Sequence, residues 1–135
     1  MRAANLADNH HRPRNAQPSL LSTKKAISLE PRDSDAYFSR GNAYDDKEEY
    51  EKEEYEKAIA DYNKVISLEP NYPWAFYSRG LDYFNEGNYD KAIADFDAGI
   101  RLKDDNIYAY CSRWDAYEGK GDHDKAIADF DKAIS

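Results

Sequence analysis

The sequence is poor in cysteine, has no long apolar run and has no excess of positive charge. Its 135 residues include one cysteine, Cys111, so no disulfide can form within the chain and nothing requires an oxidising compartment. No stretch approaches the roughly 18 consecutive apolar residues of a membrane-spanning helix. The N-terminus also lacks the apolar core of a secretory signal. These absences predict a cytoplasmic protein.

The charge balance argues against two classes of partner. Lys and Arg number 19 against 27 Asp and Glu, which gives a formal net charge of −8. Binding to a phosphate backbone needs clustered Lys and Arg side chains, and an anionic membrane surface repels an acidic protein. We therefore expect neither a nucleic acid nor a membrane as partner, but a protein or peptide.

Signs of catalysis or of a bound cofactor are also missing. No Gly-rich phosphate loop and no spacing typical of metal ligands occurs. Cys111 and His123 fall in different expected helices and have no third member to complete a catalytic group. His10 and His11 lie in residues 1–17, which have no apolar periodicity and predict a disordered, mildly basic leader. We expect no enzyme activity, no cofactor and no metal.

The sequence does contain a motif that occurs three times. Ala58-Ile59-Ala60-Asp61-Tyr62 returns as Ala92-Ile93-Ala94-Asp95-Phe96 and as Ala126-Ile127-Ala128-Asp129-Phe130. Each copy begins 34 residues after the previous one. A fixed period of about this length is typical of stacked helical repeats. Small and bulky apolar residues share one face of each expected helix, which favours close packing against a second helix.

A second recurring segment precedes each copy of this motif. The segments are Ala36–Tyr44, Ala75–Tyr83 and Ala109–Tyr117. The alternation predicts helical hairpins over residues 34–72, 73–106 and 107–135, the last one truncated. Residues 26–31 repeat the pattern of residues 65–70, so residues 18–30 predict the second helix of an incomplete repeat. A single domain over residues 18–135 follows.

The first full repeat is longer than the others. Arg40 and Arg79 are 39 residues apart, whereas Arg79 and Arg113 are 34 apart. The five extra residues form a tandem copy, Glu48-Glu49-Tyr50-Glu51-Lys52 followed by Glu53-Glu54-Tyr55-Glu56-Lys57, and no Gly or Pro marks a turn there. Two structures are consistent with this insertion. One is a lengthened hairpin that turns near residues 47–52; the other is a fused helix over residues 36–68, completed by another chain in a domain-swapped dimer.

Arginines and aspartates recur in phase with the repeats. Arg40, Arg79 and Arg113 occupy one position of the first helix, and Asp61, Asp95 and Asp129 occupy one position of the second. The arginines are either a row of cations for an acidic peptide or partners of the aspartates within the stack. Because the acids recur with the bases, we favour pairing within each hairpin.

The combined pattern resembles the tetratricopeptide repeat (TPR) family over roughly residues 18–135. The residues that carry the resemblance are Tyr37, Phe76, Tyr110, Gly41, Gly80, Tyr44, Tyr83, Tyr117, Ala58, Ala92, Ala126, Tyr62, Phe96, Phe130 and Pro70. The resemblance implies an all-α, right-handed α-solenoid of about three helical hairpins preceded by a half-repeat helix. The third repeat departs from the pattern because Trp114 stands where the first two have Gly41 and Gly80.

The resemblance also implies a non-enzymatic scaffold that binds a peptide in a concave groove lined by the first helix of each hairpin. By helical spacing, the expected lining is Phe38, Asn42, Asp45, Trp74, Tyr77, Leu81, Phe84, Tyr108, Cys111 and Asp115. Some family members clamp a C-terminal carboxylate with basic and amide side chains. Asn42 matches one clamp position, but Phe38, Ser78, Tyr108 and Ser112 stand at others, so a peptide with apolar anchors fits better. Self-assembly into homo-oligomers through the exposed apolar ends of the array is the alternative function.

Overall fold

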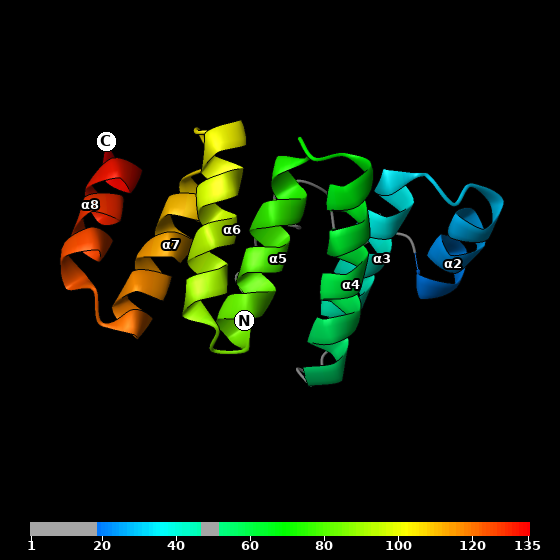
Figure 1. Ribbon diagram of the computed structural model, residues 1–135, viewed down its shortest axis with the longest axis horizontal. Coiled ribbons are helices and arrows are strands. Elements are labelled where there is room, and N and C mark those ends of the chain that lie inside the picture. The colour runs from blue at the N-terminus through cyan, green and yellow to red at the C-terminus, as the bar shows by residue number, and fades with distance from the viewer. Residues whose placement is uncertain (1–18, 47–51) are drawn as a thin grey trace.

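The computed structural model describes residues 19–46 and 52–135. These two ranges contain α-helices and no strand, and the helices follow one another in chain order along the long axis of the molecule (Figure 1). The helices are α2 (Leu20–Leu29), α3 (Ser34–Asp45), α4 (Lys52–Leu68), α5 (Pro73–Asn85), α6 (Tyr89–Leu102), α7 (Ile107–Lys120) and α8 (His123–Ile134). The expected all-α solenoid is confirmed, and its right-handed sense stays a prediction.

Short polar side chains set the starts of most helices. Asp33, Asn88, Asn106 and Asp122 each accept a hydrogen bond from a backbone N–H in the first turn of the helix that follows. These bonds satisfy donors that have no partner within the helix. Because each cap lies directly after a tight connection, successive helices reverse direction and pack as hairpins.

The first hairpin closes within one chain, so the prediction of a fused helix over residues 36–68 is wrong. Helix α3 ends at Asp45, α4 begins at Lys52, and the two helices pack against each other. Closing a short connection costs less entropy than recruiting a second chain, and the packed pair gains polar contacts. The insertion residues Glu48, Glu49, Tyr50 and Glu51 lie outside the described residues, and Lys52 is the first residue of α4.

A glycine in the first helix and an aromatic in the second bring the hairpin helices together. A Cβ atom placed on Gly41 would lie 2.6 Å from the ring of Tyr62, and one on Gly80 would lie 2.7 Å from the ring of Phe96. Both rings are fully buried. They form the centres of two apolar clusters, one around α3 and α4 and one around α5 and α6. Only a residue without a side chain permits this approach.

Helix α7 packs differently at this position. Trp114 replaces the glycine, and its ring centroid lies 5.3 Å from that of Phe130 in α8. Phe130 is 43% exposed, whereas its equivalents Tyr62 and Phe96 are fully buried. The last helix therefore carries an apolar surface that the earlier repeats cover.

Candidate functional site

Each hairpin is tied by an arginine–aspartate pair. The guanidinium groups of Arg40, Arg79 and Arg113 donate two hydrogen bonds each to Asp61, Asp95 and Asp129 of the same repeat. Such bidentate geometry fixes both side chains. The predicted pairing within each hairpin is confirmed, and the arginines are not a row of unpaired cations for an acidic peptide.

Two of these arginines also join neighbouring repeats, which the sequence pattern did not reveal. Arg79 Nη1 donates to Asn63 Oδ1 at 2.8 Å, and Arg113 Nη1 donates to Asp97 Oδ1 at 2.7 Å. Asn63 and Asp97 are 34 residues apart, so their periodicity was a signal that could have identified them. The two hydrogen-bonded carboxylates raise the pKa of Arg113. These contacts link α4 to α5 and α6 to α7.

Five of the ten residues predicted to line the groove are buried, and this corrects the expected lining. Phe38 packs on the rings of Tyr62 and Tyr72. Asn42 Oδ1 and Asp45 Oδ2 both lie within hydrogen-bond distance of the Tyr62 hydroxyl, which has one proton to donate. Tyr77 and Leu81 belong to the α5–α6 cluster. Helical spacing could not reveal the depth of each side chain. That depth depends on how far each hairpin is rotated relative to the next.

The other five predicted residues are at least partly accessible. Trp74, Phe84, Tyr108 and Cys111 are half-buried, and Asp115 is exposed. Among them, Trp74 of α5 and Tyr108 of α7 lie together, in the wall of one cavity of about 230 Å³. Lys103, Asp105, Asn106 and Ile107 complete the wall. Lys103 and Asp105 belong to the short segment that leads into α7, Ile107 is the first residue of α7, and no sequence motif marks the three as binding residues.

The cavity combines an apolar wall with a charged rim. Trp74 also meets Tyr77 edge to face, with 5.8 Å between ring centroids, which fixes the indole. Ile107 is 48% exposed, and Lys103 Nζ lies 3.3 Å from Asp105. A half-buried aromatic held from behind and surrounded by polar groups is typical of an anchor position in a protein interface.

Cys111 and Asp115 lie one helical turn apart on α7. Burial, and then the negative charge of Asp115, raise the pKa of the Cys111 thiol. Burial, and then the charge of Glu118, raise the pKa of Asp115. A thiol with a raised pKa is a weaker nucleophile at neutral pH, so this arrangement does not activate Cys111 for catalysis.

We therefore expect Asp115→Asn to speed the alkylation of Cys111. Removing the carboxylate charge lowers the thiol pKa and increases the thiolate fraction, by about twofold for a charge interaction near the surface. Alkylation by iodoacetamide at pH 8, followed by intact mass spectrometry, measures the rate. Glu53→Gln on α4 removes an equal charge far from the thiol and is the control. A rate that does not change in Asp115→Asn contradicts this electrostatic account.

Residues 19–46 and 52–135 contain no cluster of three or more His, Cys, Asp or Glu side chains placed to hold a metal ion. His10 and His11 lie outside the described residues. None of the helices in these ranges has both the length and the apolar character needed to cross a membrane.

The geometry defines a class of protein, an array of packed helical hairpins. Family models described as tetratricopeptide or TPR repeats match residues 23–60, 47–84, 73–106 and 108–135. This chain is a tetratricopeptide repeat protein. Members of this family bind protein or peptide partners. A comparison with curated protein sequences finds no match.

Solved structures show the same fold. A crystal structure of MamA protein is 36% identical, with a TM-score of 0.77 over 85% of this chain and 60% of that one. The TPR protein TTC0263 of Thermus thermophilus is 25% identical, with a TM-score of 0.75 over 98% and 71%. The second TPR of Spaghetti (RPAP3), bound to an HSP90 peptide, is 21% identical, with a TM-score of 0.70 over 79% and 95%. This chain thus spans less than two thirds of the length of that MamA chain.

Proposed function

We propose that this chain is a non-enzymatic scaffold that binds a peptide segment across the first turns of α5 and α7. The cavity between Trp74 and Tyr108 is the observation that carries this proposal. Its aromatic wall accepts an apolar side chain of the peptide, while Lys103, Asp105 and Asn106 offer polar groups to the flanking backbone. Phe84, Cys111 and Asp115 extend the same surface farther along α5 and α7.

The chemistry of the surface favours an apolar anchor over an acidic peptide end. The Spaghetti domain is bound to the HSP90 peptide SRMEEVD, which is rich in acidic residues toward its C-terminal end. At the positions of basic clamps this chain has Phe38, Ser78, Tyr108 and Ser112. Phe38, Ser78 and Ser112 are also buried. We therefore infer a partner that inserts an aliphatic or aromatic side chain between Trp74 and Tyr108.

A displayed library of random peptides tests this function. Clones selected on the wild-type protein should bind Trp74→Ala and Tyr108→Ala at least about tenfold more weakly, the effect expected when an interface anchor is removed. Tyr83→Ala is the matched control, because Tyr83 is a half-buried aromatic of α5 that does not line the cavity. Circular dichroism confirms that each variant is folded. Equal loss in the control, or no selectable clone, contradicts the proposal.

A second candidate function is self-assembly. Its support is the apolar surface at the C-terminal end of the array, where Ile127, Phe130 and Ile134 of α8 are all exposed. Contiguous exposed apolar residues on a soluble protein mark interaction surfaces. Light scattering at several concentrations tests this function, and a mass equal to the monomer at every concentration contradicts it.

A further inference from the structure

The exposed surface of α8 repeats a surface that α6 buries. Ile127 and Phe130 lie 34 residues after Ile93 and Phe96. The exposed fractions of Ile93 and Phe96 are 8% and 0%, whereas those of Ile127 and Phe130 are 56% and 43%. The first helix of the next hairpin, α7, packs against α6. The α8 surface therefore has the composition that receives a helix of the α3, α5 and α7 kind.

A polar residue on α8 indicates which side chain the docking helix should carry. Arg79 reaches Asn63 of the preceding repeat, and Arg113 reaches Asp97. Asp131 follows Asp97 by the same 34 residues and lies exposed on α8. By this register, Asp131 is the acceptor for an arginine at the position of Arg40, Arg79 and Arg113 in a docking helix. An Arg–carboxylate bond here has the geometry already present between α6 and α7.

At the other end of the array, α2 packs on the next hairpin as α4 and α6 do, but it buries fewer residues than they do. It packs against α3, yet Thr23 is its one buried residue, whereas α4 and α6 each bury five. Thr23 stands where the other repeats have Tyr62, Phe96 and Phe130, if Ala26–Pro31 is aligned with Val65–Pro70. The same alignment places Lys24 at the position of Asn63, Asp97 and Asp131. A lysine cannot accept a hydrogen bond from Arg40.

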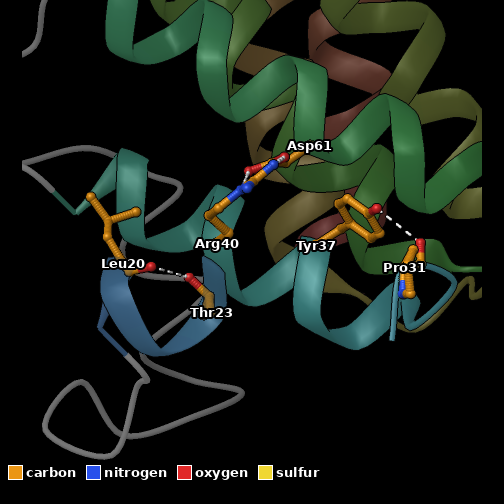
Figure 2. Close-up of polar contacts among 6 residues, drawn as sticks. All are labelled: Leu20, Thr23, Pro31, Tyr37, Arg40 and Asp61. Carbon is orange, nitrogen blue, oxygen red and sulfur yellow. Dashed lines mark hydrogen bonds and ion pairs between the residues drawn. The ribbon is translucent and has the colours of Figure 1, made fainter. Parts of the chain in front are cut away.

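A close-up shows three hydrogen-bonded contacts at this end of the array (Figure 2). Figure 2 shows the Thr23 hydroxyl bonded to the Leu20 carbonyl within α2, at 2.9 Å, and the Arg40 guanidinium directed to Asp61 of α4. The Tyr37 hydroxyl donates to the Pro31 carbonyl in the loop that follows α2, at 2.8 Å. Among the side-chain hydrogen bonds of this end, the one to α3 thus comes from the loop after α2, whereas that of Thr23 stays within α2.

We propose that α8 of a second copy docks on α3 in place of α2. Phe130 then takes the position of Thr23, and Asp131 accepts a hydrogen bond from Arg40 Nη1. Asp61 keeps its two bonds to Arg40, as Asp129 does to Arg113 in the third repeat. The new contact continues the stack of hairpins. It adds an apolar contact from Phe130 and an ion pair from Asp131, neither of which α2 provides.

The two surfaces involved lie at opposite ends of one molecule (Figure 1). A contact between unlike surfaces is heterologous, so each added copy leaves a free end and the assembly grows as a chain. This inference specifies the surface behind the second candidate function and is independent of peptide binding at Trp74 and Tyr108.

Sedimentation velocity of the full chain over a wide range of concentrations tests the proposal. We expect species that grow beyond the dimer as the concentration rises. Asp131→Lys should weaken association at least about tenfold, because the arginine then meets a like charge. Lys24→Asp should also weaken it, since α2 gains an acceptor for Arg40 and competes better with α8. A monomer at every concentration, or a dimer that does not grow, overturns the proposal.

Matched controls separate this contact from a general charge effect. Glu53→Lys makes the same change of charge as Asp131→Lys but on α4, and Lys25→Asp repeats the Lys24 change one residue along α2. Both controls should associate like the wild type. Association that falls equally in the controls overturns the assigned positions. Trp74→Ala should leave association unchanged, and Asp131→Lys should leave peptide binding unchanged. A failure of the peptide-binding proposal can therefore be told apart from a failure of the association proposal.

Hydrogen exchange measured by mass spectrometry reports on the displacement itself. The amides of Leu20–Leu29 should exchange faster in the associated protein than in the monomer, because α2 has left α3. Slower exchange of the same amides shows that α2 is covered and not replaced, and overturns the displacement.

Discussion

Arg79→Ala is expected to lower the free energy of unfolding by about 3–5 kcal/mol, the usual cost of leaving one member of a buried ion pair without its partner. The side chains of Arg79 and Asp95 are 20% and 7% exposed, and Arg79 Nη2 lies 2.7 Å from Asp95 Oδ1. Domains of this kind have a total stability of about 5–15 kcal/mol, so the loss is large. Urea denaturation followed by circular dichroism measures it.

The opposite truncation, Asp95→Ala, is expected to cost less, about 1.5–3 kcal/mol, the contribution of hydrogen bonds to a charged group. The difference arises because Asp95 is the more deeply buried partner. Its pKa is raised by burial more than the hydrogen bond and charge of Arg79 lower it. Arg79 is more exposed and still bonds Asn63 when Asp95 is removed. The control is Asp97→Ala, which removes a more exposed partner of Arg113 and should cost about 1 kcal/mol or less.

The pH dependence of the Arg79→Ala effect has a defined sign. A carboxyl group whose pKa is higher in the folded than in the unfolded protein favours folding at low pH, and that contribution is lost as the pH rises through the folded pKa. Without Arg79, the pKa of Asp95 rises further. The loss relative to wild type should therefore be small in acid, where Asp95 is protonated, and complete at pH 7. An equal loss at both pH values contradicts a role for the Asp95 charge.

Gly80→Ala is the second change with a large expected effect, a loss of about 1–3 kcal/mol from overpacking between α5 and α6. The added Cβ would lie 2.7 Å from Phe96 Cε1 and 3.1 Å from Asp95 Cβ. The Phe96 ring is fully buried and cannot move away without disturbing the cluster around it.

Gly99→Ala on α6 is the matched control for Gly80→Ala. Its added Cβ would be 3.5 Å from the Pro73 carbonyl oxygen, an ordinary contact. Replacing glycine by alanine inside a helix then favours the folded state by up to about 1 kcal/mol. Thermal unfolding should show the melting temperature falling for Gly80→Ala and holding or rising for Gly99→Ala. A fall of similar size in both variants contradicts the packing account.

Features that depend on the repeat period could be predicted from the amino acids alone. Motifs spaced by 34 residues specify which helices pair, and recurring glycine and aromatic positions specify where the paired helices cross. The pairing of Arg79 with Asp95 was predictable for the same reason, because an acid and a base that recur together on facing helices satisfy each other. The insertion before Ala58 was also visible in the sequence, but periodicity alone did not distinguish a lengthened hairpin from a fused helix.

Packing between the hairpins decided how deeply each side chain is buried. It also decided which side chains form bonds between neighbouring repeats. Helical spacing placed Trp74 and Tyr77 alike on the expected groove, yet Trp74 lines a cavity with Tyr108 while Tyr77 is 2% exposed in the core. The bond from Arg113 to Asp97 likewise crosses from one hairpin to the next. Both outcomes depend on the rotation between successive hairpins. The side chains packed between two hairpins set that rotation together, so no single repeat encodes it.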